Sequence, residues 1–289
     1  MSDSPTPEPG DKPRLGLALG SGAALGLAHV GVIRALEESG LVPDVVAGTS
    51  IGGVVGAAYV LGVLDRLEAA ARNVGWLEVL RLARIGIGTG SLLNGEAIEK
   101  EMRNYVGEVP FAGASRPFAV VACDIERNEA VTLRSGSVAS ALRASIAIPG
   151  IFAPVRREGR LLADGGLKNP VPVSVCRDLG ATHVIAVDVT GDYAGQVAAM
   201  GIAEGNDPGL YEVATLAFSI IMNAVAEANY RLYPADALVV PKIGHVKPYD
   251  FGEGGTLIEA GRKAALEALP DIHAMLDKPA SMKTVGTAG

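Results

Sequence analysis

The stretch that decides the fold is residues 14–40, RLGLALGSGAALGLAHVGVIRALEESG. Its first part, Leu15–Leu19, is an apolar run of strand length that ends at a turn rich in glycine. Residues 27–39 predict an amphipathic helix, because their apolar side chains recur at helical spacing. The apolar positions are Leu27, Val30, Ile33 and Leu36. A strand, a glycine turn and a helix in this order are typical of α/β folds.

The same order recurs along the chain. Residues 42–47 predict a second strand, followed by a helix from Ile51, and residues 182–190 are a nearly continuous apolar run typical of a strand buried on both faces. The other predicted elements are helical pieces within 65–105, hairpins around 127–128 and 158–159, and helices over 137–145, 211–230 and 256–269. The sequence therefore predicts one α/β domain over 14–270, with a mostly parallel central sheet and helices on both faces. A proline-rich disordered leader (1–13) and a C-terminal tail (271–289) flank the predicted domain.

Composition and charge exclude several classes of protein. The formal net charge of −7 argues against nucleic-acid binding, which needs clustered basic residues, and gives no general attraction to anionic membranes. No secretion signal and no apolar run of transmembrane length is recognised, which predicts a cytoplasmic protein. Cys123 and Cys176 lie in apolar contexts and are predicted to be buried thiols, with no metal site.

The glycine turn at 20–26 first suggests a phosphate cradle, because backbone amides at a strand–helix turn bind negative charge. A dinucleotide site also requires an acidic residue at the end of the second strand, but this strand begins at Asp44 and ends in VVAGTS. A phosphate loop requires lysine followed by serine or threonine after the glycines, and the turn has neither. Both nucleotide interpretations are therefore disfavoured.

Residues 48–52, GTSIG, match the motif G-x-S-x-G between a predicted strand and a predicted helix. In this context the motif predicts a nucleophile elbow, in which Ser50 lies on a strained turn and Gly48 and Gly52 avoid clashes. The amide of Ile51 would then point to a developing oxyanion. The alternative is an ordinary strand–helix turn with Ser50 as a capping residue.

A serine nucleophile needs a base. Among the four histidines, His29 lies within the first helix and fits a packing role, and His245, in a loop, is the only plausible late base. Asp164 is the stronger candidate, since the segment ADGG (163–166) places a carboxylate after a strand and before two glycines. The alternative for Asp164 is a plain Asp-Gly turn.

Three segments in order, GSGAALG (20–26), GTSIGG (48–53) and ADGGLKNPVP (163–172), resemble the patatin-like phospholipase family, and the resemblance spans about 14–270. It implies a serine acyl-ester hydrolase that acts on lipid or lysolipid esters without a cofactor or metal. It also implies a dyad of Ser50 as nucleophile and Asp164 as general base. The implied oxyanion hole comprises Ser21, Gly22, Ala23 and Ile51. The matching motif glycines are Gly20, Gly26, Gly48, Gly52, Gly165 and Gly166.

The chain departs from the family's G-G-G-x-[RK]-G turn at three positions. Ser21 and Ala23 replace glycines, and Leu25 stands where the basic residue belongs. The resemblance therefore does not imply efficient turnover of anionic phospholipids, and Lys168 is the nearby residue that could compensate for the lost charge. The departure motivates an alternative function: a catalytically weak family member that acts as a lipid-binding or regulatory protein.

Two apolar segments allow either a lipid-binding or a structural role. Val74–Ile87 is either an interfacial lid, which would give a peripheral membrane contact, or a surface helix packed on the core, which we favour. Residues 211–226 either line an acyl pocket or belong to the core, and the core is again the favoured interpretation.

Overall fold

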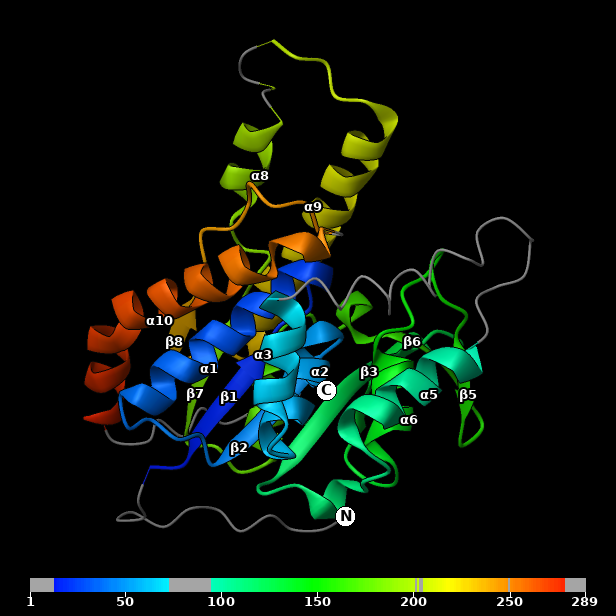
Figure 1. Ribbon diagram of the computed structural model, residues 1–289, viewed down its shortest axis with the longest axis vertical. Helices are drawn as coiled ribbons and strands as arrows, with labels where there is room; N and C mark the ends of the chain where they lie inside the picture. The colour runs from blue at the N-terminus through cyan, green and yellow to red at the C-terminus, as the bar shows by residue number, and fades with distance from the viewer. Residues whose placement is uncertain (1–12, 73–94, 201, 203–204, 249, 279–289) are drawn as a thin grey trace.

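The computed structural model describes residues 13–72, 95–200, 202, 205–248 and 250–278, so Val74–Ile87 lies outside the described residues. The described chain folds around an eight-stranded sheet in the order β5-β6-β3-β2-β1-β7-β8, with β4 also paired to β3. Helices cover both faces of the sheet (Figure 1). The predicted α/β class with a central, mostly parallel sheet is therefore confirmed.

The parallel strands form the centre and one side of the sheet. They are β1 (Leu15–Leu19), β2 (Val45–Thr49), β3 (Phe118–Asp124), β7 (His183–Val187) and β8 (Ala237–Val239). The antiparallel strands are β4 (Glu129–Leu133), β5 (Val155–Arg157) and β6 (Arg160–Asp164). β3–β4 and β5–β6 are the two hairpins that the sequence predicts. Every residue of β1, β2, β3 and β7 is buried, as expected for strands covered on both faces.

Side chains alternate along the central strands, so each face of the sheet has its own core. Leu17 and Leu19 of β1 belong to the larger core, whereas Ala18 belongs to a second core built from small residues. Helices α1 (Ala28–Glu38), α2 (Ile51–Val60) and α10 (Gly254–Leu276) pack in the larger core. Helix α7 (Val173–Asp178) covers the smaller one.

The other helices of the described chain lie around this centre. They are α3 (Leu64–Arg72), α5 (Gly95–Val106), α6 (Val138–Ser145), α8 (Tyr193–Ala199) and α9 (Leu210–Leu232), with 3₁₀ turns η1 (Ala23–Leu27), η2 (Phe111–Gly113), η3 (Gly165–Leu167) and η4 (Phe251–Glu253). Helices α8 and α9 stand side by side and project from the body of the molecule (Figure 1).

The structure corrects several predicted elements. Strand β2 begins at Val45 rather than at 42, because Asp44 is used before the strand: its carboxylate accepts from the Leu15 N–H at 2.7 Å. Helix α10 continues beyond 269 to Leu276, since Ile272 is buried in the core, so the predicted tail does not begin at 271. Helices α7 and α8 and strand β8 are not predicted from the sequence, because they are too short for a clear periodicity.

Candidate active site

Ser50 lies at the turn between β2 and α2. Its backbone has φ 55° and ψ −125°, a conformation that a non-glycine residue keeps only where the surrounding structure holds it. The motif glycines permit this turn, because a Cβ on Gly48 would lie 2.4 Å from Gly52 O and a Cβ on Gly52 would lie 2.2 Å from Leu19 O. The segment GTSIG therefore forms the strained strand–turn–helix unit expected of a nucleophile elbow.

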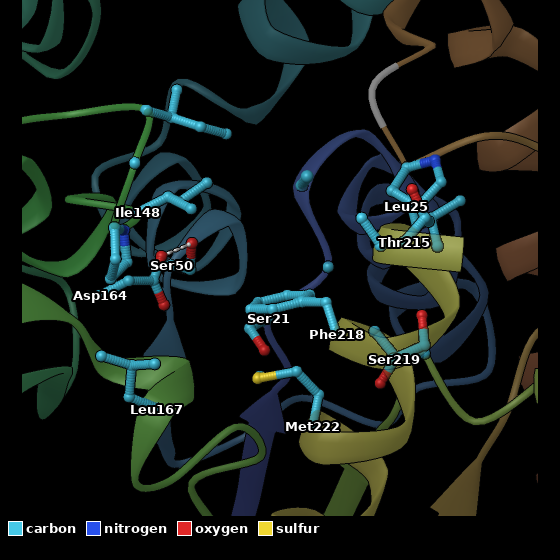
Figure 2. Close-up of a pocket in the computed structure, with 18 of the residues that line it drawn as sticks. Ser21, Leu25, Ser50, Ile148, Asp164, Leu167, Thr215, Phe218, Ser219 and Met222 are labelled. Atoms are coloured by element: carbon cyan, nitrogen blue, oxygen red, sulfur yellow. Dashed lines mark hydrogen bonds between the residues drawn. The ribbon is translucent and has the colours of Figure 1, made fainter. Parts of the chain in front are cut away.

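Asp164, at the end of β6, faces Ser50 (Figure 2). The Ser50 hydroxyl donates to Asp164 Oδ2 at 2.6 Å, and Asp164 Oδ1 accepts from the Gly166 N–H at 2.8 Å. The two residues are buried, with 4% and 6% of their surfaces exposed. One oxygen of Asp164 thus forms the Asp-Gly turn that was the alternative role for this residue, and the other oxygen accepts the hydrogen bond from Ser50.

Ser145, which no sequence motif marks, fixes the backbone of Ser50. Its hydroxyl accepts from the Ser50 N–H at 2.8 Å and donates to Val121 O of β3 at 2.6 Å. No local motif marks this serine, because its role depends on α6 ending beside β3 and the elbow.

Burial changes the acidity of Asp164. Loss of water around the carboxylate raises its pKa to about 6, while the hydrogen bonds from Ser50 and Gly166 act in the opposite direction. A general base works best when its pKa lies near the working pH. The Asp164 carboxylate is therefore a better proton acceptor at neutral pH than an ordinary aspartate.

The glycine turn lies across the cavity from Ser50, where Ser21 is labelled in Figure 2. The turn and the elbow are in contact, since a Cβ on Gly26 would lie 2.1 Å from Ile51 Cγ2. Within the described chain, the N–H groups of Gly22, Ala23 and Ile51 have no hydrogen-bond acceptor. Ala23 has φ 49°, in the left-handed region where glycine carries no steric penalty.

The predicted oxyanion hole needs one correction, at Ser21. Its N–H donates to Pro170 O at 2.9 Å, so this amide is not free to bind an oxyanion. The Ser21 hydroxyl lines the cavity instead, is buried, and has no hydrogen-bond partner among the described residues. Ser21 therefore belongs to the site through its side chain.

His29 supports the glycine turn from the core. Its Nε2 donates to Gly20 O at 2.8 Å, which assigns the ring proton to that nitrogen. Complete burial lowers the pKa of His29 to about 4, so the ring is neutral at neutral pH. The predicted packing role holds, and the bond to Gly20 gives this histidine a positioning role as well.

The dyad opens into a cavity of about 390 Å³ (Figure 2). Its apolar walls include Leu25, Ile148, Ile151, Leu167, Phe218 and Met222. Leu25 is 1% exposed and forms part of this wall. Phe218 and Met222 come from α9, so residues 211–226 line a cavity, and the favoured assignment of this segment to the core is wrong.

Two residues considered from the sequence lie away from the dyad. His245 lines a second cavity, of about 310 Å³, which shares Gln196, Thr215 and Pro248 with the first but does not reach Ser50. Lys168 does not line the cavity that holds Ser50. In the described chain, therefore, His245 is not placed as a base for Ser50, and Lys168 does not replace the missing charge at the cavity wall.

The cysteines are buried and free, as predicted. Burial is also the main cause that raises the pKa of both thiols. Among the described residues, no three His, Cys, Asp or Glu side chains gather as they would around a metal ion.

The chain is similar in sequence to several known proteins. The chain is 41% identical over 183 residues to an uncharacterized NTE family protein of Mycobacterium tuberculosis, covering 63% of this chain and 51% of that protein. It is 31% identical over 183 residues to the neuropathy target esterase sws of Drosophila melanogaster, covering 61% of this chain and 13% of that protein. Among solved structures, VipD from Legionella pneumophila aligns with a TM-score of 0.49 and 14% identity, covering 90% of this chain and 67% of that one.

The chain spans about half the length of its mycobacterial relative. The sequence profile of the family described as patatin-like phospholipase matches residues 17–177, which is more than half of the chain. This segment contains the glycine turn, the elbow and Asp164. The chain belongs to the patatin-like phospholipase family.

Proposed function

We propose that this protein is a serine acyl-ester hydrolase that acts on lipid or lysolipid esters. The observation that carries the proposal is the 2.6 Å hydrogen bond from Ser50 Oγ to a buried carboxylate at the base of an apolar cavity. Membership of a phospholipase family and similarity to a protein named an esterase support a lipid ester as the substrate class.

The first half of the reaction is acylation. Asp164 accepts the proton of the Ser50 hydroxyl while Ser50 Oγ attacks the ester carbonyl carbon. The carbonyl oxygen becomes an oxyanion, and the free N–H groups of Gly22, Ala23 and Ile51 are the donors that stabilise it. When the intermediate collapses, Asp164 returns the proton to the departing alcohol, and the acyl group remains on Ser50.

The second half of the reaction is deacylation. Asp164 accepts a proton from water, and the resulting nucleophile attacks the acyl-enzyme. Ser50 leaves with the proton held by Asp164, and the fatty acid is released. The same base serves both halves, as reversibility of acyl transfer requires.

The cavity wall favours an apolar acyl chain over a charged group. Leu25, Phe218 and Met222 offer no charge to a ligand, and Leu25 occupies the position of the family's basic residue. We therefore propose substrates whose ester is flanked by hydrocarbon and whose polar group is neutral or zwitterionic.

The alternative is a catalytically weak family member that binds lipid or regulates a partner. Leu25 in place of a basic residue is the observation that favours it. A fluorophosphonate probe separates the two functions, because it is attacked by an activated serine and loses fluoride to form a stable adduct.

The wild-type protein should be labelled on Ser50, and Ser50→Ala should abolish the labelling. Ser115→Ala is the matched control, because Ser115 is exposed and does not line the cavity, and it should be labelled as the wild type is. A wild-type protein that remains unlabelled under conditions in which it is folded would contradict the hydrolase and favour the alternative.

A further inference from the structure

Helix α9 exposes an apolar surface beside the active site. Of the ten large hydrophobic side chains that are exposed in the described chain, six lie on α9, including Ile220 at 53% and Ile221 at 60%. We define the outer face of α9 by its exposed residues Val213, Ala217, Ile220, Ile221 and Ala224. These positions recur at intervals of three and four residues, so they lie on one side of the helix.

The opposite side of α9 is part of the active-site cavity. Ser219 and Met222 are buried and line the cavity that holds Ser50. Phe218 lies next to Ala217 of the outer face, lines this cavity and is still 45% exposed, so it lies between the two surfaces. Figure 2 shows these side chains of α9 across the cavity from the dyad. The outer face is therefore continuous with the entrance of the cavity.

The charge pattern of α9 indicates what covers its outer face. No residue from Val213 to Ala226 is charged. Glu212–Leu232 is long and apolar enough to cross a membrane by length and composition, with a mean hydropathy of 1.2 and only 17% of its most apolar window buried. Because one side of α9 forms the cavity wall, the helix is better suited to lie in a lipid surface than to span it.

We propose that the outer face of α9 inserts into the surface of a bilayer of zwitterionic or neutral lipid, and that lipid substrate enters the cavity past Phe218. The choice of lipid as the occupant rests on the proposed function. The net charge of −7 and the uncharged outer face both favour hydrophobic over electrostatic binding. Binding should therefore be insensitive to salt, unlike binding to anionic lipid through basic residues.

The test is flotation of the full chain with phosphatidylcholine vesicles. It is run with Ser50→Ala, so that binding is measured without turnover and can succeed or fail independently of hydrolysis. The double substitution Ile220→Glu with Ile221→Glu should weaken vesicle binding by about tenfold or more, because charged side chains are excluded from the hydrocarbon. Val42→Glu is the control. Val42 is 55% exposed, but it lies before the start of β2, whereas Ser50 follows the end of the same strand.

Measurements of ester hydrolysis distinguish membrane insertion by Ile220 and Ile221 from a purely structural role of these two residues. Ile220 and Ile221 do not line the cavity, so the double variant with Ser50 intact should hydrolyse soluble p-nitrophenyl butyrate as the wild type does, and should lose activity only on vesicles. Vesicle binding without any ester hydrolysis would leave this proposal standing and contradict the proposed function.

Three results would overturn the proposal: no binding of the full chain to phosphatidylcholine vesicles, equal binding by the double variant, or binding confined to anionic vesicles and lost in about 0.5 M salt. Sedimentation equilibrium supplies a fourth. A dimer that the double variant dissociates would assign the outer face to a second copy of the chain.

Discussion

The Ser50 hydroxyl lies 2.6 Å from Asp164 Oδ2, although 114 residues separate the two along the chain. Strand β3 brings them together. Thr49, just before Ser50, pairs with Val121 of β3, and Asp164 pairs with the next residue, Ala122. Because β2 runs parallel to β3 and β6 runs antiparallel to it, the two strands end at the same level from opposite directions. The mixed sheet is therefore what places a buried carboxylate beside Ser50.

Asp164→Asn should abolish ester hydrolysis, while His245→Ala should leave most of it. An amide cannot accept the Ser50 proton, and general-base catalysis is worth about 10²–10⁴-fold in rate. His245 does not line the cavity that contains Ser50. Turnover of p-nitrophenyl butyrate by the purified variants measures both effects. The reverse pattern, with His245→Ala inactive and Asp164→Asn active, would contradict the dyad.

The pH dependence of kcat/KM should follow the titration of Asp164. The carboxylate must be deprotonated to act as a base, and burial raises its pKa to about 6. Activity should therefore be low well below pH 6, rise through about pH 6 and reach a plateau above it. A profile that stays flat down to about pH 4.5 would show that Asp164 keeps an ordinary pKa or is not the base.

Asp164 should also make the fold less stable at alkaline pH than an amide at the same position would. Its folded pKa of about 6 lies above the ordinary value, so protonation stabilises the folded state, and this contribution is lost as the pH rises through 6. Asp164→Asn should raise the free energy of unfolding at pH 8 by about 1–3 kcal/mol, with a difference that shrinks towards pH 4.

Urea unfolding at the two pH values measures this difference. Asp271→Asn, at an exposed position of α10, is the control and should change stability little at either pH. An Asp164→Asn protein that is less stable than the wild type at pH 8 would mean that the carboxylate's hydrogen bonds outweigh its desolvation.

His29 should be needed for the geometry of the glycine turn. His29→Leu leaves Gly20 O buried without its 2.8 Å donor, which should cost about 1–3 kcal/mol in unfolding free energy and lower kcat. His29→Gln keeps a donor and should lose less of both. Because the folded pKa of His29 is lowered to about 4, its contribution to stability should be present above its ordinary pKa and fall as the pH drops towards 4. Equal losses in the two variants would mean that His29 acts only by filling space.

The elbow at Ser50 could be predicted because a short, contiguous motif specifies its backbone, whereas Asp164 was proposed as the partner of Ser50 through the family resemblance. Gly48 and Gly52 are required by backbone contacts within a few residues of Ser50 or across one neighbouring strand. Ser145 could not be predicted, because its bond to the Ser50 N–H joins positions 95 residues apart and depends on where α6 ends.

Helix α9 shows a second reason why a sequence pattern can fail to predict the role of a segment. Its apolar residues recur at helical spacing, and that pattern is the same whether a helix faces a core, a cavity or a lipid surface. The exposed fractions of Ile220 and Ile221 distinguish these cases, and only the packing of the whole chain determines them. The hydrogen bond of the Ser21 amide could not be predicted either, since its acceptor, Pro170 O, lies in a segment distant in the sequence.

Ser21→Ala tests whether the hydroxyl that replaces a family glycine binds substrate. A Cβ on Gly166 would lie 3.1 Å from Ser21 Oγ and 3.0 Å from Asp164 Oδ1, so the Ser21 hydroxyl and the Asp164 carboxylate both lie close to this point of the site. It is buried without a partner, and a donor in this state gains most from a hydrogen bond to a bound ester.

Removing this hydroxyl should lower kcat/KM by about fivefold, the value of one ordinary hydrogen bond, while the melting temperature stays unchanged or rises. Ser21→Gly should show the same loss of kcat/KM, because it also lacks the hydroxyl. The two variants thus separate the hydroxyl from the effects of the Cβ. Wild-type kcat/KM in both would show that Ser21 contributes only its backbone bond to Pro170, since that bond survives in each.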